Sequence, residues 1–67
     1  MKVELFYIDE ILIFNNVTFV DINKLTNKID LKQIIPRENG VSIYTHGLYS
    51  GSLDDLEVIV DGESVWG

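Results

Sequence analysis

The chain of 67 residues has no cysteine, one histidine and no alanine. Without cysteine it can form neither a disulfide nor a thiolate zinc site, and one histidine cannot build a structural metal site alone. Alanine is the best helix former, whereas isoleucine, valine and the aromatic residues, which favour strands, are abundant here. The composition therefore favours β structure, and we expect neither a metal nor a cofactor.

Long hydrophobic runs are also missing. The longest, 5–8 and 11–14, span four residues each, far fewer than the ~20 that a membrane-spanning helix needs. Glu4, Asp9 and Glu10 interrupt any signal-peptide core. We therefore expect a cytoplasmic protein without membrane contact. Scarce proline and arginine beside abundant isoleucine, asparagine and lysine are typical of an AT-rich genome, such as that of a low-GC bacterium or its phage.

The length sets a limit on the core. A single domain, 1–67, buries only about 60% of the surface that its unfolded chain exposes. Chains of this size without disulfides or metals depend on tight packing or on oligomerisation. Hydrophobic residues make up 46% of the sequence, more than one small core readily hides. We therefore expect a homo-oligomer, most simply a homodimer.

The amino-terminal third predicts strands. Segments 2–8 and 10–14 have strand patterns, with either a tight turn or a bulge between them. Asn15-Asn16 predicts a two-residue hairpin turn, because asparagine tolerates the left-handed conformation. This turn would pair 10–14 with a strand over 17–21.

The middle of the chain changes period. Ile22, Leu25 and Ile29 recur at spacings of three and four, which predicts one face of a helix over 23–35, with a possible break near Asp30. A complementary ladder of basic residues at a spacing of four falls on another helical face: Lys24, Lys28 and Lys32. Asp30 and Gln33 fit a capping box, and Pro36 would end the helix.

The remaining third predicts strands again. A turn over 37–40 precedes an alternating strand, 41–45, and a flexible stretch follows over 46–52. A turn over 53–56 leads into a strand over 57–60, and Asp61-Gly62 is a strong hairpin signal.

The resulting element order, β-β-α-β-β-β, predicts an α+β domain: a small antiparallel sheet of about five strands with one helix packed on it. A small β-barrel is the alternative. The residues expected in the core are Val3, Leu5, Leu12, Phe14, Phe19, Ile29, Val58 and Val60.

Charge is distributed unequally along the chain. Residues 1–37 hold all five basic residues and five acidic ones, whereas residues 38–67 hold six acidic residues and no lysine or arginine. One interpretation is a docking face for a basic partner, because complementary fields select partners and speed association. The other is a solvated surface that keeps an apolar chain in solution. Direct nucleic-acid binding is not expected, since phosphate contacts need clustered lysine or arginine.

Candidate partner-binding residues lie in this acidic part. Asp54, Asp55 and Glu57 form an acidic cluster that lacks the ligand spacing of a calcium loop. Tyr49 and Trp66 are candidate anchors, because tyrosine and tryptophan present a large rigid surface with a polar handle. No catalytic residues are predicted, because the lone histidine lacks the partner groups that a nucleophile needs.

These observations predict a small acidic, non-enzymatic binding module, such as a phage or mobile-element inhibitor or accessory protein that docks on a basic surface of a protein partner. One alternative is a homo-oligomer that binds or sequesters a small ligand, with the 46–52 stretch and aromatic residues at a subunit boundary forming the pocket. A structural assembly protein is another.

Overall fold

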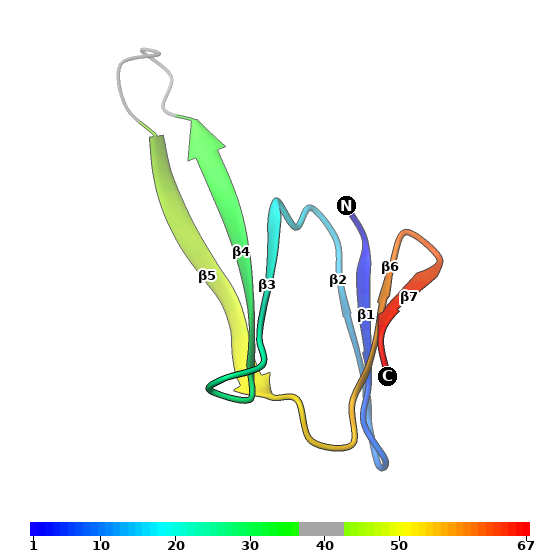
Figure 1. Ribbon diagram of the computed structural model, residues 1–67. Coiled ribbons are helices and arrows are strands. Elements are labelled where there is room, and N and C mark those ends of the chain that lie inside the picture. The colour runs from blue at the N-terminus through cyan, green and yellow to red at the C-terminus, as the bar shows by residue number, and fades with distance from the viewer. Residues whose placement is uncertain (37–42) are drawn as a thin grey trace.

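The computed structural model describes residues 1–36 and 43–67, and within these residues the chain forms strands and no helix. The strands are β1 (Val3–Phe6), β2 (Ile11–Phe14), β3 (Phe19–Asn23), β4 (Lys28–Pro36), β5 (Ile43–Ser52), β6 (Glu57–Val60) and β7 (Glu63–Trp66). They form two antiparallel sheets (Figure 1), which we call sheet A, with the order β2-β1-β6-β7, and sheet B, with the order β3-β4-β5. The predicted α+β domain is therefore wrong. The two sheets do not close, so the β-barrel alternative is wrong too.

The predicted helix over 23–35 is instead the β3–β4 hairpin. In its turn the Asn23 Oδ1 atom accepts hydrogen bonds from the backbone N–H groups of Leu25 and Thr26, at 3.0 and 3.2 Å. Asn27 then takes the left-handed conformation, with φ of 58°. A spacing of four residues is twice the strand period as well as close to one helical turn, so Lys28 and Lys32 fit both structures, whereas Lys24 lies in the turn.

The predicted hairpin at Asn15-Asn16 is also wrong, because β2 pairs with β1 and β3 pairs with β4. Asn16 does adopt the left-handed conformation, with φ of 59°, but it turns the chain from sheet A into sheet B. Val17 and Met1 exchange two backbone hydrogen bonds, of 3.0 and 2.8 Å, which attach this corner to the start of the chain. Phe19, expected in the core, is consequently 50% exposed.

Two further hairpins complete sheet A. Between β1 and β2 the chain makes a tight turn, in which the Tyr7 N–H donates to the Glu10 carbonyl at 2.9 Å. Between β6 and β7 the predicted turn is confirmed: Asp61 and Gly62 both have positive φ, 49° and 87°, as a two-residue hairpin turn requires.

The segment 46–52, predicted to be flexible, belongs to β5 and pairs with β4 along its length, with one register shift between Leu31 and Lys32. The expected turn over 37–40 lies outside the described residues, as do the first two residues of the expected strand 41–45. Towards the upper left of Figure 1, β4 and β5 run past the rest of the molecule as a projecting hairpin. The radius of gyration, 13.1 Å, accordingly exceeds the roughly 11 Å expected for a compact chain of this length.

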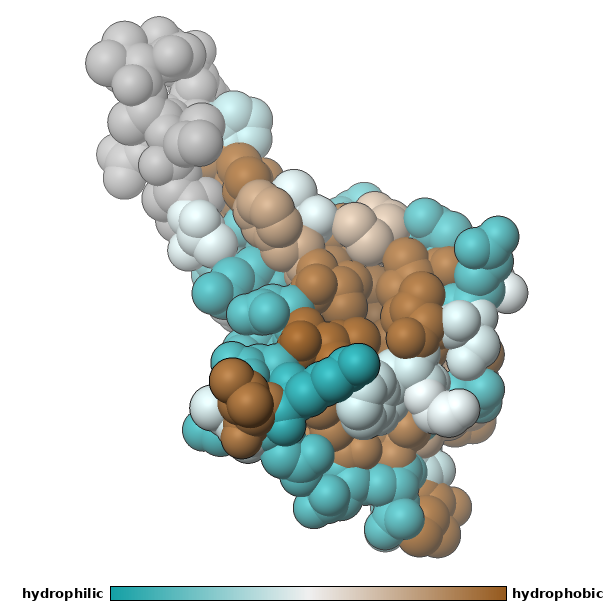
Figure 2. All heavy atoms as spheres, in the orientation of Figure 1, coloured by the Kyte–Doolittle hydropathy of each residue, from teal (hydrophilic) through white to brown (hydrophobic). Residues whose placement is uncertain are grey.

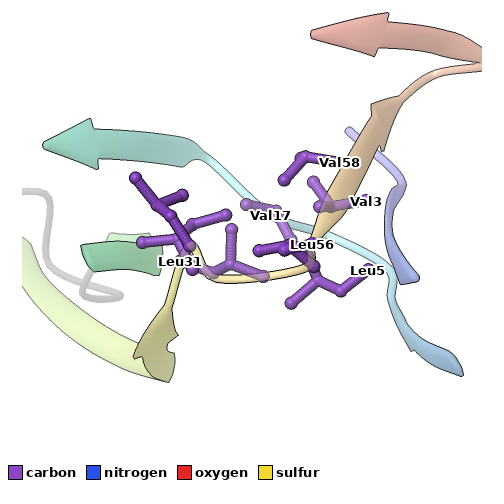
Figure 3. Close-up of a cluster of buried hydrophobic side chains, with 8 residues drawn as sticks. Val3, Leu5, Val17, Leu31, Leu56 and Val58 are labelled. Atoms are coloured by element: carbon purple, nitrogen blue, oxygen red, sulfur yellow. The ribbon is translucent and has the colours of Figure 1, made fainter. Parts of the chain in front are cut away.

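One hydrophobic cluster joins the two sheets, as Figure 3 shows around Val17. Its buried members are Val3, Leu5, Val17, Ile29, Leu31, Leu53, Leu56 and Val58. Four of the expected core residues are among them, and three others, Leu12, Phe14 and Val60, are half-buried at its edge. No helix among the described residues is long and apolar enough to cross a membrane.

Candidate functional site

An open pocket of about 660 Å³ lies at one end of sheet A. It is formed by the end of β1 with the following turn, the loop between β5 and β6, and the end of β7. Its lining residues are Phe6, Tyr7, Ile8, Leu53, Asp55, Leu56, Glu57, Trp66 and Gly67. Apolar and aromatic side chains dominate this lining, and its only two charged side chains are both acidic. We call it the Trp66 pocket.

The β5–β6 loop presents one of these acids. Leu53 and Leu56 are buried in the core and hold the loop at both ends, and the Leu53 N–H donates to the Asn27 carbonyl at 3.1 Å. Between them Asp55 has a positive φ of 54°, and its side chain is exposed. The two leucines therefore anchor the loop, while the Asp55 carboxylate faces the pocket and solvent.

A register shift in sheet A places the tryptophan. Between Val58 and Ile59 the β6–β7 pairing slips by one residue, so Trp66 lies opposite Val58. A regular hairpin would have put Val65 there, because it would continue the pairing that starts from Val60 and Glu63. Trp66 is half-buried against the core, and the Lys24 Nζ atom lies 5.9 Å from the centroid of its ring, within cation–π range.

The second acid lies on the outer face of sheet A. Glu57 pairs with Phe6 across the β1–β6 ladder, and the Ser64 hydroxyl donates to its Oε2 atom at 3.3 Å. At the tip of the β1–β2 hairpin, Ile8 is 84% exposed. Figure 2 shows hydrophobic atoms projecting at this tip, at the lower right. The pocket thus continues onto an apolar surface bordered by carboxylates.

Two tyrosines link the end of β1 to β5 by hydrogen bonds. The hydroxyls of Tyr7 and Tyr49 share a hydrogen bond of 2.8 Å, and the Tyr7 hydroxyl donates to the Ser52 carbonyl at 3.2 Å. Burial, with the hydrogen bond to Tyr49 as a second cause, raises the pKa of Tyr7 well above its usual range. The Tyr49 ring lies over the backbone of Gly51, where any Cβ would come within 2.5 Å of its hydroxyl.

Three of the five predicted site residues, Asp55, Glu57 and Trp66, come together at the Trp66 pocket. The other two lie elsewhere. Asp54 faces the β3–β4 turn, where its Oδ1 atom accepts a hydrogen bond from the Asn27 side chain at 2.8 Å. Tyr49 is half-buried against the core, with its ring centroid 5.6 Å from that of Phe14.

The apolar part of the pocket was not predicted from the sequence. Phe6 was taken as part of a strand without a role, and Leu53 and Leu56 as parts of a turn. Ile8 carried a usable signal, because an isoleucine directly before two acidic residues at a turn has little chance of burial. The convergence of these residues depends on β6 returning to pair with β1, which no local pattern encodes.

Comparison with known proteins gives no match: no family model, no curated protein and no solved structure is similar to this chain. The geometry of the site therefore carries the functional argument alone.

Proposed function

We propose that this protein is a small non-enzymatic binding module that docks on a protein partner through the Trp66 pocket. A hydrophobic side chain of the partner enters the pocket, and basic residues beside it meet Asp55 and Glu57. The observation that supports this most is the lining itself, which combines aromatic and aliphatic walls with two carboxylates. The one basic group described beside it is Lys24, whose Nζ atom lies near the Trp66 ring but does not line the pocket.

Each part of the pocket has a separate role in this proposal. Well-packed aromatic anchors supply most of the binding energy at protein interfaces and mainly slow dissociation. Carboxylates at the rim mainly speed association with a basic partner, and salt screens their effect. Two more acids, Asp61 and Glu63, lie along the β6–β7 hairpin and extend the negative field, whereas Asp54 is engaged with Asn27.

The pocket can be tested with a displayed library of random peptides selected against the whole protein. We expect selected peptides to carry a large apolar residue flanked by lysine or arginine. Trp66 is the sole tryptophan of the chain, so its fluorescence reports directly on occupation of the pocket.

The roles are separated by variants measured with one selected peptide by surface plasmon resonance, which gives the association and dissociation rates as well as the affinity. Glu57→Gln should weaken binding several-fold and reduce its dependence on salt, whereas Glu63→Gln, a matched change outside the pocket, should have a smaller effect. Trp66→Ala should weaken binding at least 10-fold through faster dissociation. Selection of peptides without basic residues, or equal effects of the two glutamate variants, would argue against docking at this pocket.

A further inference from the structure

The free edge of β2 has the backbone arrangement of a strand that can accept another strand. β2 is the end strand of sheet A, and among the described strands it pairs only with β1. Because Tyr7 and Glu10 are hydrogen-bonded partners, the antiparallel alternation turns the backbone groups of Leu12 and Phe14 towards β1. The N–H and C=O groups of Ile11 and Ile13 therefore point away from the sheet, towards the free edge.

β2 differs from the other edge strands of the described sheets. Natural edge strands are protected by charged side chains, proline or bulges. β3 carries Asp21, and β7 carries Glu63. The pairing of β7 with β6 has a register shift at Val65, and the pairing of β5 with β4 has one at Leu48. β2 reads Ile-Leu-Ile-Phe, with no charge, no proline and no register shift in its pairing.

The side chains of this edge are also unusually apolar for a free surface. Ile11 and Ile13 are 58% and 54% exposed. They lie on the outer face of sheet A, where the register places them beside Phe6 and Glu4 respectively. An unprotected edge flanked by exposed isoleucines is the arrangement expected of a strand that pairs between chains.

We propose that β2 pairs antiparallel with β2 of a second copy of this chain, with the two-fold axis at Leu12. In this register Ile11 of each copy lies opposite Ile13 of the other, which forms about four inter-chain hydrogen bonds. The two copies of sheet A become one continuous sheet. None of the residues lining the Trp66 pocket belongs to β2, so the dimer does not depend on the proposed function.

The charges of the chain are compatible with this register. Glu10 lies opposite Phe14 of the second copy, so the two Glu10 side chains are separated by about 14 Å along the strands. That distance exceeds the Debye length of about 8 Å at physiological ionic strength. Joining two short edges buries a small area, so the dimer is weak and forms in the micromolar range or above.

Sedimentation equilibrium over a range of concentrations tests the dimer. The apparent mass of the unmodified protein should rise from 7.6 kDa towards twice that value. Ile13→Lys should keep the protein monomeric, and it should leave the fold intact because the new side chain lies opposite Glu4. Leu25→Lys makes the same chemical change at a residue that is 98% exposed in the β3–β4 turn, and it should dimerise like the unmodified protein.

Amide hydrogen exchange tests whether the free edge of β2 is the dimer interface. Exchange at Ile11 and Ile13 should slow as the protein concentration rises, while exchange at Leu12, which is bonded to β1, should not change. Added salt should favour the dimer, because both copies carry a net charge of −6, whereas salt should weaken binding of a basic peptide. Three results would overturn the proposal. The first is a mass that stays at 7.6 kDa, and the second is a dimer that Leu25→Lys dissociates as completely as Ile13→Lys does. The third is protection of the Ile11 and Ile13 amides only when a basic peptide is added.

Discussion

The hydroxyl of Tyr7 joins the end of β1 in sheet A to β5 in sheet B, through the Tyr49 hydroxyl and the Ser52 carbonyl. Gly51 makes this contact possible, because it leaves room for the Tyr49 ring over the strand backbone. Tyr49 and Gly51 therefore act together. Tyr49 makes the hydrogen bond to Tyr7, and Gly51, which has no side chain, leaves room for the Tyr49 ring.

The raised pKa of Tyr7 predicts how stability depends on pH. The folded state keeps the Tyr7 proton at a pH where the unfolded chain, with the ordinary pKa of 10.0, has lost it. The contribution of Tyr7 to the free energy of unfolding is therefore complete below about pH 9 and falls as the pH rises above 10. Urea unfolding of the unmodified protein and of Tyr7→Phe at several pH values measures it. A difference between the two that stays constant up to pH 11 would contradict this account.

At the scale of elements, the β3–β4 hairpin is the clearest test of the fold. A helix over 23–35 would put Leu25 and Ile29 on the same buried face, whereas the structure exposes Leu25 by 98% and buries Ile29 completely. Leu25→Ala should change the free energy of unfolding by less than about 0.5 kcal/mol, and Ile29→Ala should lower it by about 2–5 kcal/mol. Chemical denaturation distinguishes the cases, since similar losses for both variants would favour the helix.

The same hairpin shows why the interpretation of the middle segment was wrong. Lys28 and Lys32 both lie on the exposed side of β4, because residues four apart in a strand share a face. The strand-favouring residues Ile29, Ile34 and Ile35 oppose a helix locally, whereas the apolar spacing of three and four favours one. The Asn23 side chain, which caps the turn, was the better signal.

At the scale of the whole molecule, the net charge of −6 opposes folding through self-repulsion. Salt shortens the Debye length from about 30 Å at 0.01 M to about 8 Å at 0.15 M. The second value is small against the 43 Å length of the molecule. The melting temperature should therefore rise when salt is added. Calorimetry at a concentration where the protein is monomeric separates this effect from dimerisation, and a melting temperature that falls with sodium chloride would contradict it.

The sequence by itself determined the features that depend on a few neighbouring residues. Asp61-Gly62 specifies its turn because both residues accept positive φ, and Asn16 adopts the left-handed conformation for a related reason. Strand propensity identified 57–60 and much of the amino-terminal third. Residue type alone named Asp55, Glu57 and Trp66 as candidates, without placing them together.

Only the tertiary structure decided which strands pair and in which register. The chain between β2 and β3 could form a hairpin or a corner with the same asparagines, and the difference lies in burial of Val17 against both sheets. Likewise, the register shift beside Trp66 and the return of β6 to β1 bring the pocket together. Such choices depend on contacts between residues far apart in the chain, whose free energy no local pattern contains.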